Sequence, residues 1–293
     1  MTPPTPAPTP APTPAPTSPV PAGPLFAPAP ASAPVRRGPT STSRSRMAAL
    51  GRAELTLLLR SRAALFTALV LPATMAFSMR GLVKSLDLAG TGLSIATVLL
   101  PGTLAMALFF SIYTNLVGVY VTRRESLVLK RLRTGEVRDA EILAGGALPA
   151  VVLALVQCLL LAVGLTMVLD APAPAAPHLA LLGLLGGVAM LVALSALTAA
   201  FTRTAESAQL TFLPFMLVTM AGSGLFLPRE VLPGAAADIS AWLPFSPVMD
   251  LLRGGWTGDL GGMDQVRLLL VTAAWTTAAI LGVRHWFRWS PRH

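Results

Sequence analysis

Long apolar stretches dominate the chain from residue 63 onward. Six of them follow one another, and the first five contain no charged residue. A helix needs about 20 residues, at about 1.5 Å each, to cross a hydrocarbon core of about 30 Å. The pattern therefore predicts an all-α membrane protein with six transmembrane helices. We place these spans at residues 63–79, 93–121, 142–169, 179–201, 208–227 and 266–286.

Three shorter segments between and before the spans have amphipathic patterns. Residues 47–62 place leucines near one helical face and charged residues largely elsewhere, which is typical of a helix lying in the membrane interface. The loop 122–141 mixes apolar and basic residues and predicts a short amphipathic helix that breaks near Gly135. The loop 228–265 repeats apolar residues at helical spacing on both sides of two prolines. We expect two short helices there, either re-entrant or lying on the outer surface.

The first 46 residues have a different composition from the rest of the chain. They repeat Pro, Ala and Thr and end in a basic stretch. Such a segment cannot bury enough apolar surface to fold, and it lacks the apolar centre of a signal peptide. We expect residues 1–46 to form a disordered cytoplasmic tail and residues 47–293 to form one membrane domain.

Composition supports lipid as the main solvent of this chain. Apolar residues make up 54% of it and charged residues only 12%, whereas a soluble domain has about 25% charged residues. The net charge is +9, and the basic residues lie beside the apolar stretches. They do not alternate with aromatic residues, and no nucleic-acid-binding module is present. The basic residues therefore indicate contact with membrane lipid and no binding of nucleic acid.

The basic residues also predict the orientation of the chain in a plasma membrane. Positive charge accumulates in the cytoplasmic loops of membrane proteins. If both termini are cytoplasmic, all but five of the 22 Lys and Arg residues fall on the inner side. We therefore expect a multi-pass protein with both termini in the cytoplasm. The five outer residues are Arg80, Lys84, Arg229, Arg253 and Arg267.

No segment of the sequence carries catalytic or metal-binding chemistry. A Gly-x-x-x-x-Gly-Lys-Ser/Thr loop is absent, so we expect no cofactor on this chain and ATP binding only by a partner. His178, His285 and His293 lie at opposite helix ends on this topology, which excludes a shared metal site. The lone Cys158 lies in an apolar run and is expected to be buried and inert. Glycines in the third and fourth spans are expected to allow close helix packing.

Two motif regions, one after the second span and one before the last span, carry a resemblance to a known family in the setting of this span order. Residues 123–145 read RRESLVLKRLRTGEVRDAEILAG and follow the second span. Residues 224–234 read GLFLPREVLPG, and residues 242–254 read WLPFSPVMDLLRG, both before the last span. With the amphipathic N-terminal helix, this order resembles the membrane subunits of ABC-2 type exporters, a family that includes bacterial drug and polysaccharide efflux permeases. The resemblance covers about residues 47–286.

The resemblance implies roles for two groups of residues. The first group resembles the coupling helix that contacts the ATPase: Arg124, Glu125, Ser126, Leu129, Lys130, Arg131 and Leu132. The second group resembles an extracellular helical hairpin between the fifth and sixth spans that acts as an outer gate: Pro228, Leu232, Pro233, Pro244, Phe245, Pro247 and Arg253. The implied partners are a separate ABC ATP-binding subunit and a second permease subunit, in a homodimer or a heterodimer.

The function that the resemblance implies is export of an amphipathic substrate, such as a drug, antibiotic, lipid or glycan. ATP hydrolysis by the partner chain would drive it, so this chain is not expected to be an enzyme. A membrane enzyme would need paired carboxylates or histidines, but Asp170 and Glu206 fall on opposite sides of the membrane. A non-transporting sensor or scaffold in a resistance system remains the alternative.

Overall fold

The computed structural model describes residues 74, 77–78, 80–81, 83–84, 94–127, 129, 139–225 and 234–287. The chain divides into two compact units, Met1–Ser41 and Thr42–His293, and all described residues belong to the second. Within these described ranges every regular element is a helix. Helices suit an apolar solvent because each one satisfies its backbone hydrogen bonds internally.

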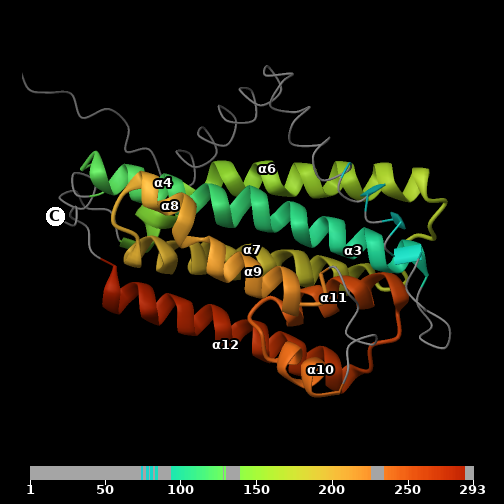
Figure 1. Ribbon diagram of the computed structural model, residues 1–293. Coiled ribbons are helices and arrows are strands. Elements are labelled where there is room, and N and C mark those ends of the chain that lie inside the picture. The colour runs from blue at the N-terminus through green and yellow to red at the C-terminus, as the bar shows by residue number, and fades with distance from the viewer. Residues whose placement is uncertain are drawn as a thin grey trace, which may run out of the picture. The chain divides into compact units, whose positions relative to one another are not determined.

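Four long helices run alongside one another and form a bundle (Figure 1). Each is long and apolar enough to cross a membrane. The first is continuous but contains three pieces, since a π-helical segment, η1, separates α3 from α4. Their bounds are α3 Ile95–Leu108, η1 Phe109–Thr114 and α4 Asn115–Glu125, then α6 Asp139–Val168, α7 Pro177–Phe201 and α12 Gly262–Trp286.

These four helices coincide with the second, third, fourth and sixth spans expected from the sequence. The fifth expected span, 208–227, is divided into α8 Ala205–Thr211 and α9 Leu213–Gly222. The break falls at Phe212, just before Pro214, whose missing N–H removes a helical hydrogen bond. The first expected span, apart from isolated positions, and the segments 1–46 and 47–62 lie outside the described residues. A count of six therefore stays a prediction.

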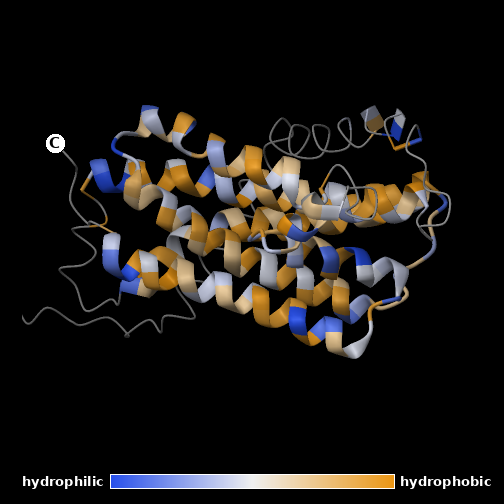
Figure 2. Cartoon of the chain, turned by 60° about the horizontal axis from the view of Figure 1, so that its bottom comes forward, coloured by the Kyte–Doolittle hydropathy of each residue, from blue (hydrophilic) through white to orange (hydrophobic). Residues whose placement is uncertain are grey.

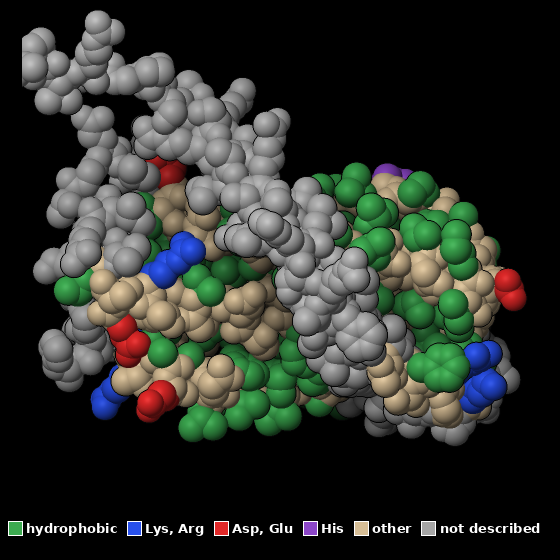
Figure 3. All heavy atoms as spheres, turned by 90° about the horizontal axis from the view of Figure 1, so that it is seen from above, with side chains coloured by type: hydrophobic (Ala, Val, Ile, Leu, Met, Phe, Trp, Pro, Cys, Tyr) green, Lys and Arg blue, Asp and Glu red, His purple; other side chains and the backbone are tan. Residues whose placement is uncertain are grey.

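Hydropathy changes along each long helix, from an apolar middle to more polar ends. In Figure 2 the middle parts of the long helices are apolar or neutral, and the hydrophilic segments lie mainly at helix ends. On the face drawn in Figure 3, the described charged side chains lie toward the two ends, with apolar and uncharged groups between them. Large apolar side chains of α6 and α12, such as Leu159, Met167 and Leu270, are exposed. Lipid is the solvent that accommodates such surfaces.

The loop before α12 forms two helices, α10 Gly234–Ala241 and α11 Ser246–Thr257. Every α11 residue from Ser246 to Trp256 is buried. The helix ends at Thr257, where Gly258 adopts a left-handed φ of 73°. α11 packs against α3, α7 and α12 inside the bundle. Whether this pair of helices is re-entrant in the membrane or lies at its outer surface stays a prediction.

Glycines on α7 allow α11 to approach closely. A Cβ added at Gly183 would lie 3.0 Å from the Leu252 backbone N, and one at Gly187 would lie 2.9 Å from Val248 Cγ1. Gly186 faces Thr272 of α12 in the same way, at 3.1 Å. The expected role of these glycines in close packing is confirmed for α7. It does not extend to Gly145, which has no neighbour within 4 Å.

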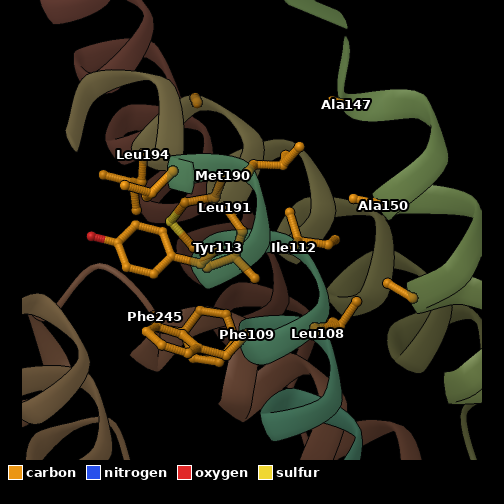
Figure 4. Close-up of a cluster of buried hydrophobic side chains, with 14 of the residues drawn as sticks. Leu108, Phe109, Ile112, Tyr113, Ala147, Ala150, Met190, Leu191, Leu194 and Phe245 are labelled. Atoms are coloured by element: carbon orange, nitrogen blue, oxygen red, sulfur yellow. The ribbon is translucent and has the colours of Figure 1, made fainter. Parts of the chain in front are cut away.

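An aromatic cluster joins α11 to the middle of the bundle (Figure 4). The Phe109 ring meets the Phe245 ring edge to face at 6.1 Å between centroids. The ring centroid of Tyr113 lies 5.0 Å from that of Phe109 and 4.8 Å from that of Phe215 in α9. These separations fall in the range of favourable aromatic pairs. The π-helical segment is thus the point where α9 and the start of α11 meet the first long helix.

The same π-helical segment makes polar contacts with two other helices. The Ser111 hydroxyl donates to the Gln157 side chain of α6. Tyr113 Oη and Thr198 Oγ1 of α7 are 2.8 Å apart. Polar side chains in an apolar bundle are costly unless they pair, so each contact favours one register between helices.

We predict that Gly255→Ala separates α11 from α7. The added Cβ would lie 2.7 Å from the Ala180 backbone N and 2.6 Å from its Cβ, so no flexible side chain can move aside. Overpacking of this kind costs about 1–3 kcal/mol. We expect a lower apparent Tm of the detergent-purified protein. The matched control is Gly164→Ala in α6, where no atom lies within 4 Å. Equal Tm values for the two variants would contradict this packing.

Candidate functional site

Five helix ends lie at one end of the bundle. α4, α7 and α12 finish there, and α6 and α8 begin there. We call it the Arg124 end. It contains the described part of the expected coupling segment, which the structure follows to Leu127 and again at Leu129. Lys130, Arg131 and Leu132, and the amphipathic helix expected around them, lie outside the described residues.

Arg124 is fully buried, although the sequence places it in a charged loop. Its Nη1 donates to the Ala199 carbonyl at 2.8 Å, and its Nη2 donates to the carbonyls of Thr202 and Arg203. These carbonyls belong to the last turn of α7 and the residues just after it. The last carbonyls of a helix have no partner within the helix, and the C-terminus attracts positive charge. Arg124 therefore caps α7.

Glu125 makes the corresponding contact with the next helix. Its Oε1 accepts a hydrogen bond from the backbone N of Ala205, the first residue of α8, at 3.2 Å. The Thr204 hydroxyl caps α8 as well, by accepting from the Ser207 N at 3.1 Å. A carboxylate beside a helix N-terminus is stabilising. Two consecutive residues of α4 thus hold the end of α7 and the beginning of α8.

The chain turns sharply after this pair. The Ser126 hydroxyl donates to the Thr122 carbonyl at 2.9 Å and ends α4. Leu127 has a φ of 59°, a left-handed conformation that is uncommon for a non-glycine residue. Leu129 is buried, whereas Ser126 and Leu127 are exposed. Ser126 and Leu127 are therefore the exposed described residues directly after Glu125, while Arg124 and Leu129 face inward.

Arg124 and Glu125 connect the end of α4 to two neighbouring helices. Arg124 makes three hydrogen bonds to the end of α7 and the residues after it, and Glu125 makes one to the start of α8. Charge-assisted hydrogen bonds of this kind are stronger than neutral ones and hold a fixed geometry. The end of α4 is therefore held to both neighbouring helices.

The expected outer-gate residues lie toward the other end, around α11. Phe245 and Pro247 are buried at the start of α11, and Pro244 is partly buried. Arg253 is buried too, and its Nη2 donates to the Gly224 carbonyl just after α9 at 3.0 Å. This bond ties α11 to α9. Pro228, Leu232 and Pro233 lie outside the described residues.

Two features of this site were not foreseen from the sequence. The polar contacts of Tyr113 and Gln157 were missed because both residues lie in otherwise apolar stretches. A glutamine inside an uncharged span was the available signal, since polar groups in a membrane helix usually have a partner. The inward direction of Arg124 had no local signal, because its acceptors lie 75 to 79 residues away.

We predict that Arg124→Gln destabilises the protein. The shorter, neutral side chain cannot reach all three carbonyls, and a buried polar group without a partner costs about 1–3 kcal/mol. Arg203→Gln is the matched control, because the Arg203 side chain is exposed and only its carbonyl is used. Unfolding of both variants in mixed detergent micelles should show the loss for Arg124→Gln alone. Equal losses would show that net charge, not capping, matters here.

Comparison with known proteins adds to this geometry. A search of curated proteins found no significant match. The sequence profile of the ABC-2 type transporter family matches residues 45–256, which is well over half of the chain and includes α3 to α11. This match and the four helices that can span a membrane together establish the family of the protein. The chain belongs to the ABC-2 type transporter family.

Proposed function

We propose that this chain is the permease subunit of a bacterial ABC exporter, with six spans and both termini in the cytoplasm. Family membership makes it a membrane component of an ABC transporter, which works with an ATP-binding subunit and is not itself the catalytic enzyme. The finer proposal is that a separate ATPase binds and hydrolyses ATP, and that this chain moves an amphipathic substrate outward. A second permease subunit, identical or different, completes the path.

The observation that carries this proposal is the capping pair at the Arg124 end. An ATPase on the cytoplasmic side can act on the spans only through inner segments. The segment after Glu125 is such a contact, and its base is bonded to α7 and α8. Both elements connect the Arg124 end with the other end of the bundle. α7 does so as one long helix, and α8 does so through α9, which follows it. A push on one short segment would therefore move α7, which packs against α11, and α8, which contacts α9.

The interior supports an amphipathic substrate rather than a small ion. Buried charged side chains among the described residues are Arg124, Asp250 and Arg253, and they lie near the ends of the bundle. The middle of the first long helix is aromatic and aliphatic, with hydroxyl groups from Ser111 and Tyr113. Charged groups that mark ion pathways in membranes are therefore absent from the described middle of the bundle.

Orientation is tested by cysteine labelling in intact cells. We expect Met263→Cys, at the start of α12, to react with an impermeant maleimide and Ser126→Cys, after α4, to stay unlabelled until the cells are opened. Both positions are exposed, and the native Cys158 is buried, which keeps the background low. The reverse labelling pattern would place the Arg124 end outside and end the coupling proposal.

Coupling is tested with Glu125→Lys and Glu125→Gln. Gln keeps an acceptor for the Ala205 N, whereas Lys removes it and places a positive charge at the start of α8, which is unfavourable by about 0.3–1 kcal/mol. We expect Lys to lower ATP-driven transport in inverted vesicles several-fold and Gln to lower it less. Membrane insertion should be normal for both.

The partner ATPase is first identified by co-purification from native membranes. The purified chain alone should hydrolyse no ATP, and hydrolysis should appear with the partner. Robust turnover by the isolated chain would overturn the proposal. Wild-type transport by Glu125→Lys at equal expression would remove this contact from the coupling route. A partner complex with no ATP-dependent transport of any amphipathic substrate would favour a sensor or scaffold.

A further inference from the structure

A cavity of about 700 Å³ lies at the Arg124 end, between α6, α7 and α12 and beside the last turns of α4. This volume is in the range of sites that bind small molecules. The cavity is separate from the capping pair, since neither Arg124 nor Glu125 lines it. It also does not include the aromatic cluster around Phe109.

The wall of the cavity is apolar and made of small side chains. Five alanines contribute to it from α6 and α7, with Ile280 and Val283 from α12. Tyr120 is the polar group of the deeper wall, and its hydroxyl already donates to the Leu143 carbonyl at 3.0 Å. A ligand that fills this space therefore needs an apolar body. The alanines are Ala140, Ala144, Ala189, Ala193 and Ala196.

The rim of the cavity carries a cation. Arg284, in the last turn of α12, is exposed and lines the cavity. No ion pair or hydrogen bond of its side chain is found within the described residues. Asp139 lines the rim as well, but it already has an interaction of its own and opens α6, where the helix N-terminus stabilises a carboxylate.

The surroundings place this cavity at the boundary between lipid and water. Ile280 lines it and is 43% exposed, so the wall continues into the apolar outer face of α12. Trp286, next to the rim, is half exposed and packs against Phe201 at 5.7 Å between ring centroids. Tryptophan and basic residues at the end of a span are typical of the headgroup level. A molecule with an apolar tail and an anionic head fits both the apolar wall of the cavity and the cationic rim at Arg284.

We propose that this cavity binds one anionic phospholipid, with an acyl chain against the alanine wall and its phosphate at Arg284. A basic residue near the membrane surface attracts anionic lipid headgroups, and the cavity has one in Arg284, although Asp139 lines the same rim. The inference goes beyond the proposed function and needs neither the ATPase nor a transported substrate. Under the proposed orientation, the lipid comes from the inner leaflet.

The test is lipid retention by the purified chain in detergent, measured by native mass spectrometry. Phosphatidylglycerol and phosphatidylcholine with the same acyl chains are added at equal concentration. We expect preferential retention of phosphatidylglycerol and a loss of about fivefold in Arg284→Gln, which corresponds to about 1 kcal/mol for one basic residue. Asp139→Asn should increase retention, because it removes a negative charge from the rim.

Two kinds of control separate this site from general lipid contact. Arg267→Gln removes an exposed arginine from the opposite end of α12 and should leave retention unchanged. Ala144→Trp and Ala189→Trp fill the cavity from two exposed positions, so they should abolish retention without disturbing the buried core. The Tm of each variant checks that it is folded.

The outcomes distinguish specific lipid binding in the cavity from non-specific lipid around the protein. Equal retention of the two lipids would overturn the proposal, as would equal losses in Arg284→Gln and Arg267→Gln. Undiminished retention in both tryptophan variants would do the same. None of these results depends on transport or ATP hydrolysis, so failure here leaves the proposed function standing, and failure of that function leaves the lipid site standing.

Discussion

The contact between Arg124 and the end of α7 is the interaction on which the arrangement of the bundle depends. A helix leaves its last carbonyls without partners inside the helix, and those of buried residues such as Thr202 need another donor. The buried guanidinium of Arg124 satisfies them from α4. Since α4, η1, α11 and α12 all pack on α7, the position of this one helix sets where the others lie.

The two ends of the bundle are connected by continuous packing. Thr198, one residue before the carbonyl that Arg124 caps, bonds Tyr113 in the π-helical segment. Tyr113 packs on Phe109, which meets Phe245 at the start of α11. Arg253 then ties α11 to the segment after α9. Packed interiors shift between discrete arrangements rather than deforming smoothly. Such packing suits a protein that switches between two conformations.

The outer faces of the bundle have a different task from its interior. α6 and α12 expose long apolar side chains, whereas the first long helix is mostly buried. The cavity beside Arg284 lies where α6 and α12 meet α7. Polar groups are used sparingly: Arg124 and Arg253 fasten helix ends, and Arg284 faces the surface. Burial thus separates Arg124 and Arg253, which bond backbone carbonyls, from the exposed Arg284.

The sequence by itself determined the four described spans and the family, because apolar length and motif order are local properties of the chain. It did not predict the break at Phe212, although Pro214 was visible, since a proline can also sit in an unbroken span. It did not predict that α11 is buried in the bundle. Only tertiary structure decided these points, together with the capping by Arg124. The burial of α11 depends on Gly183 and Gly187 of another helix, and the Arg124 acceptors lie at least 75 residues away, so neither contact has a signal in its own neighbourhood.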